Sequence, residues 1–107
     1  MYPDRRHIEV YVSPSMSDSQ LLHVVAHELG HAVDMVRNDG QDQIDWRALR
    51  GFDPDTMWWA DPFTSDFATP SGDFAECFAN WAIGSVSRSA KGGCAGTSAF
   101  IQAAVSG

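Results

Sequence analysis

The chain has 107 residues, of which 44% are hydrophobic, so it can form one small domain with a modest core. Its formal net charge is −7 at pH 7, which argues against nucleic acid or an anionic membrane surface as a partner. It contains no apolar run of roughly 18 residues, so we expect no membrane span. We expect a single domain over residues 1–107, by itself or within a longer protein.

The first predicted elements are a short strand and a long helix. Residues 8–12 alternate apolar and polar side chains and are rich in β-branched residues, which is typical of a strand. Ser17 and Gln20 have the spacing of a capping box, and apolar residues then recur at helical spacing. Residues 38–40, Asn-Asp-Gly, are typical of the end of a helix, so the pattern predicts a helix over residues 18–37.

Three shorter helices are expected after it, over residues 43–50, 73–83 and 98–105, the last capped by Thr97. Residues 52–72 contain three prolines and a glycine and are expected to be irregular. With one short strand, the predicted fold class is α+β and mostly helical.

The strongest chemical signal is His27-Glu28-Leu29-Gly30-His31, an H-E-x-x-H motif in the middle of the long helix. Histidines four residues apart share one helix face, so both imidazoles can bind one metal ion. Glu28 is rotated by about 100° from His27, which places its carboxylate beside the ion as a general base for an activated water. Gly30 permits close approach of a neighbouring element. The motif predicts one Zn²⁺ per chain and a peptide or protein substrate.

A catalytic zinc usually has three protein ligands, and the third is expected to be a carboxylate. Glu76 is preferred, because Glu9 lies on the strand and Glu28 is the base. Asp73 is the alternative ligand, or it forms a D-x-x-E capping box with Glu76 at the start of the helix over residues 73–83. The next candidates are Asp34, Asp61 and Asp66.

Three further polar residues lie near these ligands in the predicted helices. Asn80, one turn after Glu76, could hold that carboxylate by a hydrogen bond, and Asp34, one turn after His31, could orient an imidazole. Asp34 could equally be a solvated carboxylate at the helix end. His23 is expected to line the cleft or the surface rather than to bind the metal.

The two cysteines, Cys77 and Cys94, lack the spacing of a zinc knuckle or a redox C-x-x-C motif. We predict that they form a disulfide, which would contribute roughly 3 kcal/mol on the chain-entropy model. A disulfide favours a secreted or cell-envelope protein, whereas two free thiols would suit a cytoplasmic one.

Around the motif the chain resembles the gluzincin metallopeptidases, in particular the group of the anthrax lethal factor catalytic domain and the bacterial minigluzincins. Residues 27–34, His-Glu-Leu-Gly-His-Ala-Val-Asp, are similar to that group's extended metal motif. Residues 74–79, Phe-Ala-Glu-Cys-Phe-Ala, resemble its glutamate helix. The resemblance covers roughly residues 17–37 and 66–84. It implies a compact zincin-like fold and a zinc-dependent endopeptidase.

The chain departs from the group's pattern in two places. Gly72 stands four residues before Glu76, where the group has its ligand glutamate, so the ligand role moves to Asp73 or Glu76. Residues 52–72 contain no Tyr or His that could stabilise an oxyanion. Two alternatives therefore stay open: a zinc-binding scaffold with weak or no activity, and a zinc hydrolase of a non-peptide amide.

Overall fold

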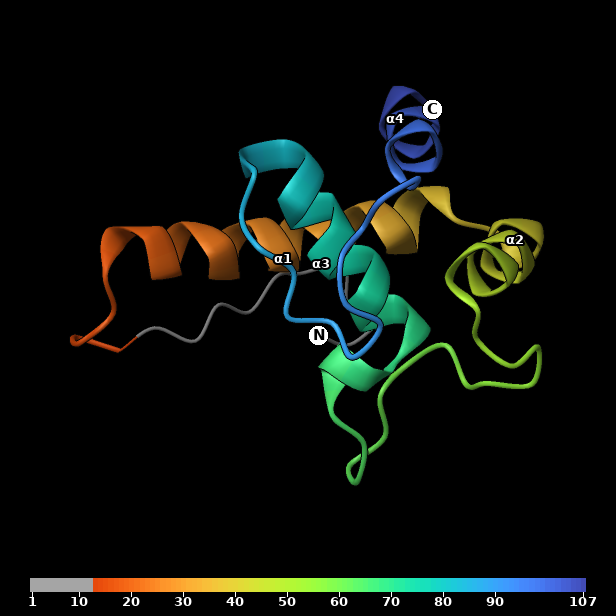
Figure 1. The fold of residues 1–107 in the computed structure, drawn as a ribbon, viewed down its shortest axis with the longest axis horizontal. Coiled ribbons are helices and arrows are strands. Elements are labelled where there is room, and N and C mark those ends of the chain that lie inside the picture. Colours follow the sequence, from red (N-terminus) through yellow and green to blue (C-terminus); the bar gives the residue numbers. More distant parts are fainter. Residues whose placement is uncertain (1–12) are drawn as a thin grey trace.

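The computed structural model describes residues 13–107, and most of them are helical. The elements are α1 (Asp18–Arg37), α2 (Gly40–Arg50), the 3₁₀ helix η1 (Asp66–Ala68), α3 (Pro70–Ile83) and α4 (Ser98–Ser106) (Figure 1). Residues 13–107 contain no strand, and the strand predicted over residues 8–12 lies outside the described part. Within that part, no helix is both long and apolar enough to cross a bilayer. The described chain is a compact, mostly helical domain.

Helix α1 begins and ends where the sequence predicts. Ser17 Oγ accepts a hydrogen bond from Gln20 N at 3.2 Å, and Gln20 Oε1 accepts one from Ser17 N at 2.8 Å, so the predicted capping box is present. Asn38 is extended and ends the helix after Arg37. Figure 1 shows α1 lying along the long axis of the molecule, and α3 and α4 pack against it.

Helix α2 begins at Gly40, three residues earlier than predicted. Asp39 and Asp42 form a second capping box there, each accepting a hydrogen bond of 2.9 Å from the backbone N–H of the other. The helix ends at Gly51, whose φ of 72° is the left-handed conformation that glycine adopts without strain, as expected from the sequence.

Helix α3 also begins three residues earlier than predicted, at Pro70 rather than at Asp73. Thr69 is the N-cap, and its Oγ1 accepts a hydrogen bond from Gly72 N at 3.0 Å. Proline suits the first position of a helix because its missing N–H has no partner there in any case. Pro70 is therefore part of the helix start, and the helix stops at Gly84 as predicted.

Helix α3 crosses α1 at Gly30. A Cβ at Gly30 would lie 2.7 Å from Ala75 Cα and 2.9 Å from Ala75 O, closer than real Cβ atoms come. The missing side chain thus lets the two backbones touch, which is the close approach that the sequence suggested for this position. The crossing, visible in Figure 1, brings the histidine face of α1 against the first turns of α3.

An aromatic cluster joins α3 to α2 and α4. The rings of Trp46, Phe74 and Phe100 pack edge to face, with centroids 5.1 to 6.2 Å apart. The predicted disulfide between Cys77 and Cys94 is present, with a Cα–Cα distance of 5.4 Å. It ties α3 to the segment that precedes α4.

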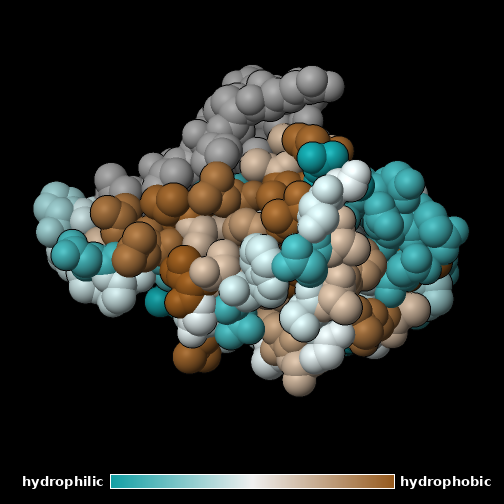
Figure 2. Space-filling view, turned by 90° about the horizontal axis from the view of Figure 1, so that it is seen from above, coloured by the Kyte–Doolittle hydropathy of each residue, from teal (hydrophilic) through white to brown (hydrophobic). Residues whose placement is uncertain are grey.

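Helix α1 buries its polar face and exposes much of its apolar one. The apolar stripe recognised in the sequence is largely at the surface, and Figure 2 shows a band of hydrophobic side chains on this side of the molecule. The exposed apolar residues of α1 are Leu21, Leu22, Val25, Leu29 and Val36. Its buried residues include His23, His27, His31 and Asp34. Buried titratable side chains need partners, and α3 with η1 provides them for the three histidines.

Candidate metal centre

His27 and His31 direct their Nε2 atoms at one carboxylate, that of Asp66. Asp66 Oδ2 lies 2.6 Å from His27 Nε2 and 2.9 Å from His31 Nε2. One ligand atom from each of the three side chains lies within 4.8 Å of the other two. Both histidines are buried, and Asp66 is partly exposed. This group could hold a metal ion.

The donor set fits a zinc ion. Two imidazole nitrogens and one carboxylate oxygen are ordinary zinc ligands, with bonds of about 2.0–2.2 Å that hold neighbouring ligand atoms roughly 3.3 Å apart in a tetrahedron. The distances from Asp66 to the histidines are somewhat shorter than that. The Asp66 carboxylate would therefore have to draw back slightly to admit an ion.

The second nitrogen of each imidazole is also held. Glu76 Oε2 lies 2.6 Å from His27 Nδ1, and Ser71 Oγ lies 3.0 Å from His31 Nδ1. Both partners stand on α3 and are fully buried. Metal-binding histidines characteristically use their other ring nitrogen in this way, because the bond fixes the orientation of the ring. Here it turns both Nε2 atoms toward Asp66.

Glu76, preferred as the third ligand from the sequence, lies behind His27 instead. Its carboxylate also accepts hydrogen bonds from His23 Nε2 at 2.9 Å and from Arg88 N at 2.6 Å. Burial raises the pKa of Glu76, but the bonds from His27 and Arg88 outweigh it and lower the pKa. These donors hold the carboxylate on the side of the imidazole opposite Asp66. The structure therefore brings Asp66 to the position expected for Glu76.

Asp73, the alternative ligand, is placed in the core of the fold. It forms a two-bond ion pair with Arg50, at 2.8 and 3.0 Å, and accepts a hydrogen bond from Trp46 Nε1 at 3.1 Å and another from Ser89 Oγ. Since the N-cap of α3 is Thr69, Asp73 is not the helix cap either. Its contacts join α2 and the loop before α4 to α3.

Asp34 and Asn80 lie near the site but do not hold its ligands. Asp34 accepts hydrogen bonds from Trp58 Nε1 at 2.8 Å and from Asn38 Nδ2 at 2.7 Å, and burial raises its pKa despite these bonds. Asn80 is exposed and donates to Ser85 O at 3.0 Å. Among residues 13–107, neither is hydrogen-bonded to a histidine of the site. His23, expected in the cleft or at the surface, is a buried partner of Glu76 and also lines a pocket next to Ser85.

Glu28 carries a buried oxygen atom that has nothing to bind. Its Oε2 is inaccessible to solvent and has no hydrogen-bond partner in the described part of the chain. Buried carboxylate oxygens are paired in the large majority of cases, so an unpaired one needs an explanation such as a catalytic role. The general-base role of Glu28 stays a prediction, and an unpaired oxygen on the residue that follows His27 fits it.

The charges around His27 favour a proton on its imidazole. Burial alone would lower the pKa of His27, but its hydrogen bonds to Asp66 and Glu76 raise it to about 9. Burial would raise the pKa of Asp66, but its bonds to the two histidines lower it well below the usual range. A metal ion that binds His27 Nε2 at neutral pH must therefore displace a proton.

Two aromatic rings from the segment that precedes α3 flank the histidines. The Phe67 ring lies 5.8 Å from that of His27, and the Trp59 ring lies 6.2 Å from that of His31, measured between centroids. Phe67 follows Asp66 directly in η1. Apolar walls of this kind lower the local dielectric constant and strengthen charge interactions at the site.

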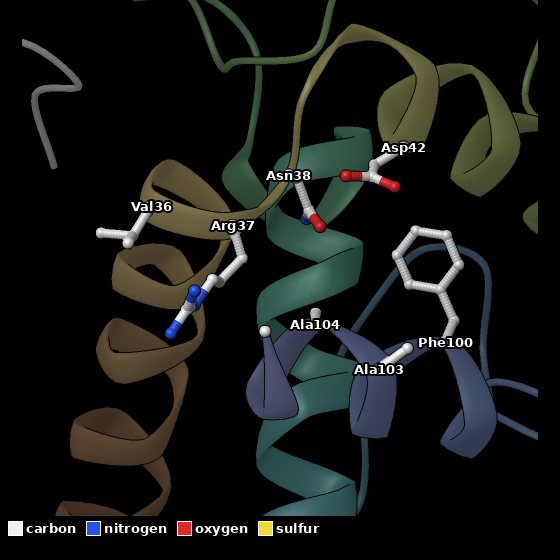
Figure 3. Close-up of a pocket in the computed structure, with 8 residues that line it drawn as sticks. Val36, Arg37, Asn38, Asp42, Phe100, Ala103 and Ala104 are labelled. Atoms are coloured by element: carbon white, nitrogen blue, oxygen red, sulfur yellow. The ribbon is translucent and has the colours of Figure 1, made fainter.

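A cavity of about 280 Å³ lies elsewhere, between the end of α1, the start of α2 and α4 (Figure 3). It is lined by Val36, Arg37, Asn38, Asp42, Phe100, Ala103, Ala104 and Gly107. None of the three candidate metal ligands lines it, so it is separate from the metal centre.

Comparison with known protein families, with curated proteins and with solved structures found no match for this chain.

Proposed function

We propose that this chain is a zinc-dependent peptidase in which His27, His31 and Asp66 bind the ion and Glu28 is the general base. The observation that carries the proposal is the convergence of three ligand atoms within 4.8 Å. The proposal is supported by Oε2 of Glu28, which is buried and has no hydrogen-bond partner among the described residues. The resemblance of residues 27–34 to the gluzincin motif supplies the reaction, hydrolysis of a peptide bond.

Each residue then has a definite task. A bound zinc ion would supply a Lewis acid that polarises the scissile carbonyl and makes water a better nucleophile near neutral pH. Glu28 accepts the proton of the attacking water and passes it to the departing amine. Glu76 and Ser71 keep the two imidazoles in the orientation that points Nε2 at the ion.

Substitution of Glu28 by glutamine tests this function. Glu28→Gln keeps the size of the side chain but removes its basicity, so we expect it to retain about one zinc per chain. Cleavage of a fluorogenic unfolded protein should fall by about 10²–10⁴-fold. Asp18→Asn, the same chemical change at the exposed start of α1, is the matched control and should alter neither zinc content nor cleavage.

Two results would count against the proposal. Equal cleavage by the wild type and Glu28→Gln would remove Glu28 as the base. A wild type fully loaded with zinc that cleaves no unfolded protein would favour the zinc-binding scaffold instead.

A further inference from the structure

Asp66 reaches the two histidines because position 72 carries no side chain. A Cβ added to Gly72 would overlap the carbonyl carbon and oxygen of Asp66 and would lie 3.0 Å from its Cγ. The obstacle is backbone, so no change of rotamer could relieve it. With any residue other than glycine at this position, the turn that carries Asp66 would have to move.

Hydrogen bonds hold the Asp66 carbonyl against the first turn of α3. Its oxygen accepts from Thr69 N at 3.1 Å and from Thr69 Oγ1 at 2.8 Å. The same hydroxyl oxygen accepts from Gly72 N at 3.0 Å. On the other side, Ala90 N donates to Phe67 O at 2.8 Å. These hydrogen bonds fix the turn to α3. The turn can lie in this position only because Gly72 has no Cβ.

We infer that Gly72 is a positioning residue of the metal centre: it offers no ligand atom, but it determines where the third ligand lies. This inference rests on the proposed metal site. The two histidines depend on the crossing of α1 and α3, whereas Asp66 depends on the packing of η1 against α3. Metal affinity can therefore be changed at position 72 while all three ligand residues stay in the chain.

Helix propensity separates this role from a merely structural one. Alanine favours a helix interior more than glycine does. If Gly72 served only the helix, Gly72→Ala would leave the fold at least as stable and the metal affinity unchanged. If Gly72 positions Asp66, the variant should lose metal affinity even where α3 is intact.

The test is a titration of the purified protein with Co²⁺, whose visible spectrum reports the ligands around the ion. Gly72→Ala should weaken Co²⁺ binding at least about 10-fold, the lower end of what loss of a supporting residue costs, and should change the spectrum. Gly40→Ala is the matched control, because a Cβ there would meet nothing within 4 Å. It should bind Co²⁺ like the wild type.

A compensating change sharpens the test. Glutamate is one methylene longer than aspartate, so Asp66→Glu should reach the histidines from a displaced turn. The double variant Gly72→Ala with Asp66→Glu should recover part of the affinity that Gly72→Ala loses, and Asp66→Glu alone should bring no gain. Such coupling between the two substitutions is expected if position 72 determines where residue 66 lies.

The outcomes are distinct. Equal Co²⁺ affinity of Gly72→Ala and the wild type would overturn the inference. A wild type that binds no Co²⁺ would overturn the proposed function instead. A crystal structure of Gly72→Ala would then still decide whether position 72 determines where Asp66 lies, by showing whether its carboxylate has left the two Nε2 atoms. If Gly72→Ala does not fold, Thr69→Val removes the hydroxyl that holds the Asp66 carbonyl. It should also weaken Co²⁺ binding, and unchanged binding would contradict the inference.

Discussion

Glu76 and Asp66 lie on opposite edges of the His27 imidazole. Glu76 Oε2 is 2.6 Å from Nδ1, and Asp66 Oδ2 is 2.6 Å from Nε2. One carboxylate is buried behind the ring and is held by three donors, and the other is partly exposed beside a second histidine. We therefore propose that Asp66 binds the metal ion and that Glu76 orients the ring.

The first prediction separates these two roles. Glu76→Gln should weaken zinc binding by about 10- to 100-fold, the usual effect of removing a partner of a ligand, and Asp66→Ala should weaken it more. Affinities would be measured by competition with a chromophoric chelator. Asp61→Ala, an exposed carboxylate of the same segment, is the control and should have no effect. The opposite ranking would return the ligand role to Glu76.

The second prediction concerns pH. The ion binds the deprotonated imidazole, whereas His27, with a pKa raised to about 9 by Asp66 and Glu76 against the effect of burial, holds a proton at neutral pH. Zinc affinity should therefore fall by up to about tenfold for each pH unit below 9 from this group alone. Titrations from about pH 6 to about pH 8 would measure the slope, and a flat profile would contradict the assignment.

The same shift affects stability in protein stripped of metal. Because folding raises the pKa of His27 above its unfolded value of 6.5, the protonated imidazole stabilises the fold. This stabilisation is complete below pH 6.5 and is lost as the pH rises through a pKa of about 9. Urea denaturation of the stripped protein should therefore show lower stability above pH 9 than at pH 6.5. Saturating zinc should reduce this difference, because the ion replaces the proton.

The third prediction concerns Asp73. Asp73→Ala leaves the buried Arg50 without its partner, which should cost about 3–5 kcal/mol of folding free energy. The zinc stoichiometry of the folded variant should stay at one. Asp45→Ala, an exposed position on α2, should change stability by less than about 0.5 kcal/mol. Loss of zinc from a stable Asp73→Ala protein would restore Asp73 as a ligand.

The fourth prediction concerns the disulfide. Cys77 and Cys94 are 17 residues apart, so opening their loop should cost roughly 3 kcal/mol on the chain-entropy model. Thermal unfolding with and without a reductant would measure this loss. Alkylation should label neither thiol in the native protein and both after reduction. Two reactive thiols before reduction would contradict the bond.

The sequence predicted what depends on local pattern. The capping box at Ser17, the glycine stops at Gly51 and Gly84 and the close approach at Gly30 are each determined by a few neighbouring residues. The Cys77–Cys94 pair was the only pairing that two cysteines allow. These features agree with the structure.

The third proposed ligand, Asp66, could not be found in this way. Elimination among the three glutamates led to Glu76, and Asp66, in a segment expected to be irregular, was only one of the next candidates. Asp66 lies against the backbone of Gly72, a contact that no pattern of side chains reports. The signal that could have pointed to Asp66 was Thr69-Pro70, which is typical of a helix start. A helix that begins at Pro70 rather than at Asp73 has Asp66 within one turn of its first residue.

The most direct test of the metal centre is a crystal structure of the zinc-loaded protein with anomalous data at the zinc absorption edge. Our account predicts one anomalous peak about 2.0–2.2 Å from His27 Nε2, His31 Nε2 and a carboxylate oxygen of Asp66. Glu76 should remain on His27 Nδ1. A peak bound by Glu76 in place of Asp66, or no peak between the two histidines, would contradict it.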